Sequence, residues 1–108
     1  MKLIENQIFH IYNRGNNRQP IFFKQENYHF FLKKMRTHLL PTCDFLAYCL
    51  MPNHFHFLIR TDARTVASVA KNEKDIAVTA FSKGLRTMLS SYAQAIQKQE
   101  KMTGSLFQ

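Results

Sequence analysis

The chain of 108 residues has no long apolar run and only two cysteines. No stretch approaches the roughly 18 consecutive apolar residues of a membrane span, so no spanning helix is expected. The first residues, Met1 to Gln7, are too polar for the hydrophobic part of a secretory signal. Cys43 and Cys49 are too few for a disulfide framework and wrongly spaced for a Cys-x-x-Cys zinc site, so both should be reduced. These absences favour a single cytoplasmic domain over residues 1–108.

Acidic side chains are also scarce. Seven Asp and Glu stand against fifteen Lys and Arg, which gives a formal net charge of +8 and a pI near 9.8. Such a balance favours a polyanionic partner. Nucleic acid is the stronger candidate, because no helix of the sequence sets a basic face against a lipophilic one as membrane-surface helices do. A small basic protein that binds nothing specific is the alternative.

Ten Phe and four Tyr are present. The spacing of apolar residues along the chain is typical of a domain that contains both strands and helices. Alternating side chains predict strands over 9–14, 44–51 and 54–61, the last two joined as a hairpin at Pro52-Asn53. Apolar steps of three and four residues predict helices over 25–40 and 75–101, with Gly84 a weak point in the second. A short helix is expected over 65–71 and the start of a last strand at 106–107. The order predicts an α+β fold, a ferredoxin-like antiparallel sheet with helices packed on one face.

The triplet His54-Phe55-His56 opens the third predicted strand. Alternation places His54 and His56 on one face, whereas Phe55, Phe57 and Ile59 point into the core. Two imidazoles on one strand face form half of a metal site. Oxygen ligands, water and substrate would complete it, which suits Mg²⁺ or Mn²⁺ better than a closed zinc site. The other histidines are scattered along the chain, and two solvated strand histidines are the alternative.

A basic protein with an open two-histidine site suits phosphodiester chemistry, which needs a nucleophile. Tyr92 has the most suggestive setting, because Ser91, Ala93 and Ala95 leave room beside its ring. A long C-terminal helix docked on the sheet could place this phenol over the two histidines. The competing interpretation is a core tyrosine that packs with Met88 and Ile96 at helical spacing.

Three blocks of the chain together carry a family resemblance. The motif block is 47–59, which includes Met51-Pro52-Asn53-His54-Phe55-His56-Phe57-Leu58-Ile59. The strand-and-loop block is 10–23, which begins His10-Ile11-Tyr12-Asn13-Arg14-Gly15-Asn16-Asn17-Arg18. The tyrosine-helix block is Ser91-Tyr92-Ala93-Gln94-Ala95-Ile96, followed by Gly104-Ser105-Leu106-Phe107-Gln108. These blocks resemble the HUH (His-hydrophobic-His) single-tyrosine transposases, and among them the REP-associated tyrosine transposases. His-x-His alone would be a weak signal, but the blocks occur in the family's order.

The resemblance implies metal-dependent nicking and strand transfer of single-stranded DNA at hairpin-associated sites, in the cytoplasm at the nucleoid. By match, His54 and His56 hold Mg²⁺ or Mn²⁺, and Tyr92 attacks the scissile phosphorus. The products are a 5′-phosphotyrosine and a free 3′-hydroxyl, so the bond energy is kept for rejoining. The insertion-sequence branch acts as dimers with the tyrosine supplied by the partner, and the REP-associated branch is associated with monomers. The match favours Tyr92 acting in its own chain, as a monomer, with a homodimer still open.

The family's third metal ligand lies about one helical turn beyond the tyrosine. That position is Ile96, which cannot ligate. Where members of the family often have Asn, this chain has Gln97, so the resemblance makes Gln97 the first candidate, although it lies about 140° around an ideal helix from Tyr92; Gln94 is the second. A local distortion of the helix, or water in place of a protein ligand, is a further alternative.

Contact with DNA is expected from the polar loop after the first strand. Its candidates are Arg14, Asn16, Asn17 and Arg18, which could grip phosphates or a hairpin base. Exposed aromatics such as Tyr12 or Phe23 could stack on unpaired bases.

Two other function classes stay open from the sequence. One is a non-catalytic module that binds single-stranded nucleic acid with its sheet aromatics. The other is a metal-dependent phosphodiesterase that uses activated water instead of a tyrosine.

Overall fold

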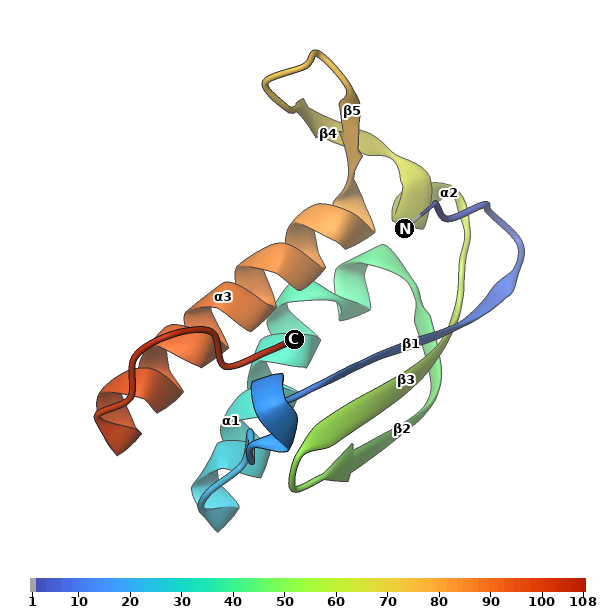
Figure 1. Cartoon of the computed structure of the whole chain (residues 1–108). Helices are drawn as coiled ribbons and strands as arrows, with labels where there is room; N and C mark the ends of the chain where they lie inside the picture. The colour runs from blue at the N-terminus through green and yellow to red at the C-terminus, as the bar shows by residue number, and fades with distance from the viewer. Residues whose placement is uncertain (1) are drawn as a thin grey trace.

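A three-stranded antiparallel sheet lies at the centre of the computed structural model, which describes residues 2–108. Its strands are β1 (Ile8–Arg14), β2 (Asp44–Met51) and β3 (His54–Arg60), in the order β1-β3-β2. The long helices α1 (Gln25–His38) and α3 (Ala80–Glu100) pack together on one face of this sheet (Figure 1). The α+β class, the antiparallel sheet and the C-terminal helix are therefore confirmed.

Strict alternation along β3 separates a core face from an open face. Phe55, Phe57 and Ile59 are fully buried beneath the helices, and the residues between them remain partly exposed. Burial of one such side chain stabilises the fold by about 1.5–3 kcal/mol. Because β3 is the central strand, this alternation fixes which face the helices cover and leaves the histidines on the other.

The two long helices run antiparallel and approach closely. Asn27 near the start of α1 is hydrogen bonded to Gln99 near the end of α3, at 3.0 Å from its Nδ2 to Oε1. Gly84 lies beside His38 at the other end of the pair, where a Cβ on residue 84 would come 2.4 Å from the His38 carbonyl oxygen. Gly84 is therefore a contact point between helices, and α3 continues through it without a break.

The segment between β3 and α3 differs from the prediction. The expected helix over 65–71 is instead a single turn, α2 (Ala63–Val66), followed by β4 (Ser68–Lys71). β4 pairs with β5 (Ala77–Thr79) in a hairpin that projects from the body of the molecule (Figure 1). The long helix consequently begins at Ala80 and not at Asp75, and the Thr79 hydroxyl caps it by accepting from the Ser82 amide at 3.3 Å.

The chain ends against the outer edge of β1. Gly15 and Phe107 form an isolated antiparallel bridge, and the Gln108 amide donates to the Arg14 carbonyl at 2.9 Å. The predicted last strand is thus represented by a single bridge in the described residues. Cys43 and Cys49 are both free; Cys43 is a buried, packed thiol, whereas Cys49 is exposed. Among residues 2–108, no helix combines the length and the apolar character needed to cross a bilayer.

Candidate metal and nucleic-acid site

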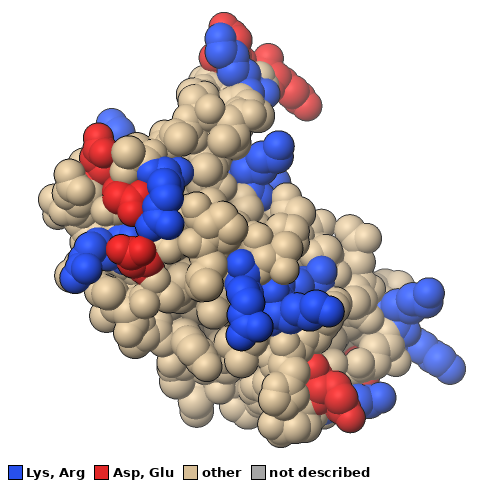
Figure 2. Space-filling model, turned by 180° about the vertical axis from the view of Figure 1, so that it is seen from behind, with Lys and Arg blue, Asp and Glu red and all other residues tan. Residues whose placement is uncertain are grey.

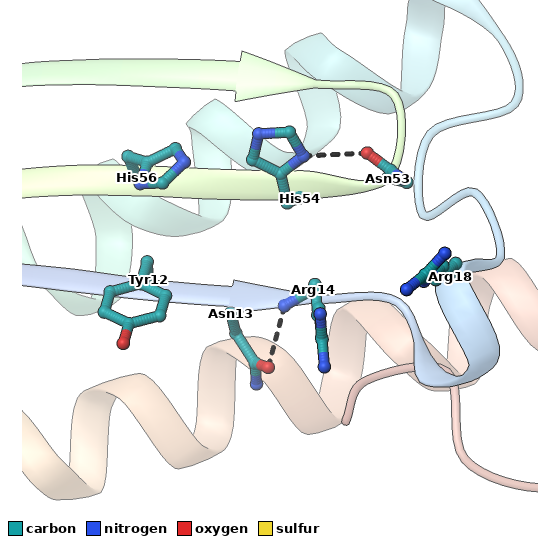
Figure 3. A pocket seen from close by; sticks show the side chains of 7 residues that line it. All are labelled: Tyr12, Asn13, Arg14, Arg18, Asn53, His54 and His56. Carbon is teal, nitrogen blue, oxygen red and sulfur yellow. Dashed lines mark hydrogen bonds between the residues drawn. The ribbon is translucent and has the colours of Figure 1, made fainter.

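His54 and His56 lie next to each other on the open face of β3 (Figure 3). Their ring centroids are 5.0 Å apart and the ring planes are nearly perpendicular, at 88°. His54 Nδ1 lies 2.7 Å from the Asn53 Oδ1 atom in the turn that precedes the strand. The shared face that alternation predicts for these two residues is confirmed.

A third histidine, His10 on β1, belongs to the same cluster. Its Nε2 atom lies 2.7 Å from His56 Nδ1, and the two rings stack with centroids 4.9 Å apart. The register of β1 against β3 explains this, because Tyr12 pairs with His56 and Arg14 with His54. The sequence places His10, Tyr12 and Arg14 on one strand face, but the pairing of β1 with β3 was needed to bring that face to the histidines.

An open hollow of about 440 Å³ lies beside the histidine pair. Side chains reach it from β1, from the turn before β3 and from the short 3₁₀ helix η1 (Asn16–Arg18), as Figure 3 shows. Its lining includes His54, His56, Asn53, Tyr12, Arg14 and Arg18. Imidazole nitrogens, two guanidinium groups and an exposed phenol therefore share one accessible surface.

Two of the four loop residues predicted to contact DNA are part of this surface. Arg14 and Arg18 line the hollow, whereas Asn16 and Asn17 are outside its lining. Asn17 instead makes the turn with a left-handed backbone (φ 55°), a conformation that asparagine tolerates. The Asn16 amide donates to the Leu106 carbonyl at 2.8 Å. The loop is therefore joined to the C-terminal segment by its backbone and to the hollow by its arginines.

The charge around the hollow is positive and largely unpaired. The ion pairs within residues 2–108 join Arg64 to Asp44 and Asp62, and Lys71 to Asp75. Arg14 and Arg18 belong to none of them. On the back of the molecule, acidic side chains lie beside basic ones at the tip of the β4–β5 hairpin, at one edge and near the bottom, and a further group of Lys and Arg side chains lies between them (Figure 2).

The environment of His56 favours its neutral form. Its pKa is lowered from the ordinary value of 6.5, first by partial burial and then by the neighbouring His10 and His54. A metal binds the neutral imidazole, so this shift reduces the competition from protons.

Tyr92 does not lie where the sequence analysis predicted. Its ring is fully buried on the helix-covered side of the sheet, among Phe22, Phe31 and Phe107. The phenol donates a hydrogen bond of 2.6 Å to the Ile21 carbonyl. Burial, and secondarily Tyr28, raises the pKa of this phenol well above its usual value of 10. The predicted placement over the histidines is wrong, because the sheet separates Tyr92 from them, and the core interpretation describes its position.

Gln97 is also absent from the histidine cluster. Its amide donates to the Gly104 carbonyl just beyond the end of α3, on the helix side of the sheet. Gln94, the second candidate ligand, donates to the Ser90 hydroxyl one turn back along the helix, at 3.2 Å. Both predicted placements near a metal are wrong for the same reason as that of Tyr92: α3 covers the opposite face.

The donor set of the open face fits a weakly held, open cation site. Within residues 2–108, no group of three or more His, Cys, Asp or Glu side chains has an arrangement that could hold a metal ion, so His10, His54 and His56 do not form a three-ligand site. Two imidazoles beside an open hollow leave most of a coordination shell for water and phosphate oxygens. This arrangement suits a hard cation that keeps waters, such as Mn²⁺ or Mg²⁺, better than a closed structural zinc site.

Comparisons of the chain with protein-family models, with curated proteins and with solved structures give no match. The residues of the open face and their geometry are therefore the features of this chain that point to a function.

Proposed function

We propose that the open face of the sheet binds single-stranded DNA together with a divalent cation and cuts a phosphodiester bond there, as a transposase-like nicking domain. The observation that supports this most is the convergence of His54, His56, Arg14 and Arg18 on one accessible hollow. A cation site flanked by guanidinium groups that form no ion pair within residues 2–108 matches a substrate that is a chain of phosphates.

His54 and His56 would hold Mg²⁺ or Mn²⁺ on this face. The cation, when bound, supplies charge that stabilises the phosphate oxygens as they become more negative. The chain's own residues do the remaining work. Arg14 and Arg18 contact the backbone phosphates on either side of the cut, and the exposed Tyr12 ring provides a stacking surface for an unpaired base.

Tyr12 replaces Tyr92 as the candidate nucleophile. It is 67% exposed on the open face, with its ring centroid 6.0 Å from that of His56. In the transfer step its phenol oxygen bonds to the scissile phosphorus as the bond to the 3′ oxygen breaks. The phenolic proton is transferred to the departing oxygen, which becomes a 3′-hydroxyl. The 5′-phosphate of the other DNA fragment remains bonded to the tyrosine as a phosphotyrosine. Figure 3 shows the Tyr12 hydroxyl turned away from the histidines, so the step requires rotation of this exposed side chain.

We further propose that the sheet is a ferredoxin-like one whose fourth strand position lies at the outer edge of β1. The order β1-α1-β2-β3, the β1-β3-β2 arrangement and the Gly15–Phe107 bridge support this topology. Action as a monomer, on hairpin-bearing DNA of the nucleoid in the cytoplasm, is part of this proposal and rests on the resemblance to the REP-associated branch.

The test is incubation of the protein with Mn²⁺ and single-stranded hairpin DNA, followed by a denaturing gel that detects a covalent adduct. An adduct that is lost in His54→Ala and in Tyr12→Phe, and kept in Tyr92→Phe, supports the proposal. Cleavage that survives both tyrosine substitutions without an adduct would assign the attack to water. Loss of the adduct in Tyr92→Phe alone, with the stability of the variant unchanged, would restore Tyr92 as the nucleophile.

A non-catalytic module for single-stranded nucleic acid is the second candidate. The stack of His10, Tyr12 and His56 favours it, because the rings lie 4.9–6.0 Å apart on an open sheet face and offer a platform for bases. If the protein binds single-stranded nucleic acids of varied sequence without a cation and does not cut them, this second function is the correct one.

A further inference from the structure

Both histidines of the proposed cation site have the same ring atom engaged by a neighbour. His54 Nδ1 lies 2.7 Å from Asn53 Oδ1, and His56 Nδ1 lies 2.7 Å from His10 Nε2. At such distances one atom of each pair carries the hydrogen. The Nε2 atoms of His54 and His56 are free of such contacts within residues 2–108.

The contact to Asn53 fixes the hydrogen on His54. A carboxamide oxygen only accepts, so His54 Nδ1 must donate, and its Nε2 then carries the lone pair. The turn that presents Asn53 is held by backbone hydrogen bonds. The Gly15 amide donates to the Asn53 carbonyl at 2.9 Å, and the Ile21 amide donates to the Pro52 carbonyl at 2.8 Å.

The contact to His10 can fix the hydrogen on His56 in the same way. If His10 Nε2 accepts, His56 Nδ1 donates and His56 Nε2 carries the lone pair, as in His54. In water a neutral histidine prefers its hydrogen on Nε2, which would block that atom as a ligand. Two neighbours that both hold the hydrogen on Nδ1 therefore prepare the pair for binding through Nε2.

We propose that His10 and Asn53 are positioning residues that hold His56 and His54 in the Nδ1–H tautomer and so leave both Nε2 lone pairs for a cation. The tautomer assignment stands on the metal-free geometry, and only its use for a cation rests on the proposed function. His10 thus has a role that neither its isolated place in the sequence nor the HUH pair itself indicates.

Nitrogen-15 NMR of the metal-free full chain, at a pH where the histidines are neutral, tests the tautomers directly. We expect the hydrogen on Nδ1 of both His54 and His56. His10→Ala should move the hydrogen of His56 to Nε2 and leave His54 unchanged, and Asn53→Ala should do the reverse, so each variant is the control for the other. His10→Gln keeps an acceptor oxygen near His56 and should retain the Nδ1–H form.

A wild-type His56 with its hydrogen on Nε2 would overturn the proposal, because His10 would then be the donor. So would a His10→Ala protein, still folded by its amide spectrum, in which His56 is unchanged. Mn²⁺ titration adds a second readout: loss of an outer partner should weaken binding about 10–100-fold in His10→Ala, with recovery in His10→Gln. Correct tautomers with no Mn²⁺ binding in the wild type would refute the cation site and leave the tautomer assignment standing.

Discussion

Substitution of Tyr92 by Phe separates the structural role of this residue from a catalytic one. The change removes only the hydroxyl that donates to the Ile21 carbonyl at 2.6 Å. Ile21 is fully buried, so its oxygen would lose this partner away from water. A buried polar group left unpaired costs about 1–3 kcal/mol, and we expect the free energy of unfolding to fall by that amount. For a domain of this size, that corresponds to a decrease in Tm of roughly 4–8 °C per kcal/mol.

The measurement is urea unfolding of the wild type, Tyr92→Phe and the matched control Tyr48→Phe. Tyr48 is 53% exposed on β2, so its substitution should change the free energy of unfolding by less than about 0.5 kcal/mol. The reasoning fails if Tyr92→Phe is as stable as the control. Full stability together with a lost DNA adduct would mean that the phenol leaves the core to react, and the family-based assignment would then be right.

Three further predictions concern the pKa of Tyr92, the helix contact at Gly84 and the role of Arg18 in DNA binding. In an alkaline titration followed by tyrosinate absorbance, one tyrosine should ionise only when the protein unfolds, and Tyr92→Phe should remove that step. Because the folded pKa of Tyr92 is raised above the unfolded value of about 10, stability is complete below that pH and falls above it by about 1.4 kcal/mol per pH unit until the folded pKa is reached. Gly84→Ala should lower the free energy of unfolding by about 1–3 kcal/mol in a urea titration, since its Cβ would meet the His38 carbonyl oxygen at 2.4 Å, and a gain in stability would contradict the close helix contact. Arg18→Ala should weaken binding of single-stranded DNA and lower the slope of log affinity against log salt concentration by about 0.7. Arg64→Ala should change neither quantity, because Asp44 and Asp62 already pair with Arg64. Equal effects of the two substitutions in a binding titration would argue against the hollow as the contact surface.

The alternation of apolar residues predicts the three strands of the central sheet well, but the sequence does not predict the segment between β3 and α3. β2 matches its predicted bounds, and β1 and β3 differ from theirs by one residue at one end, because alternation and the Pro52-Asn53 turn act over a few neighbours. The start of α3 was predicted five residues early, since 75–79 carries no stop signal and β5 exists only through its pairing with β4. Pairing partners lie far apart in the sequence, and a single strand of three residues has no periodicity of its own.

The same limit explains His10. Alternation along β1 predicts which face of the strand His10 occupies. It does not predict that β3 lies beside β1, because the same alternation would be seen with any neighbouring strand. Only the antiparallel register, with Tyr12 opposite His56, brings the His10 ring onto the His56 ring. Metal or acid–base clusters built across strands are therefore harder to predict from sequence than those within one strand, such as His54 and His56.

The position of Tyr92, in contrast, could have been deduced. Alternation that puts His54 and His56 on one face of β3 commits Phe55 and Phe57 to the other, and a helix with an apolar stripe must cover the apolar face. Met88, Tyr92 and Ile96 are spaced by four residues and are all buried, so Tyr92 belongs to the stripe itself. A residue in that stripe faces the phenylalanines and has the sheet between it and the histidines. Any nucleophile that serves His54 and His56 in this fold must therefore come from the open face or reach it from outside, and Tyr12 is the tyrosine that lines the hollow beside them.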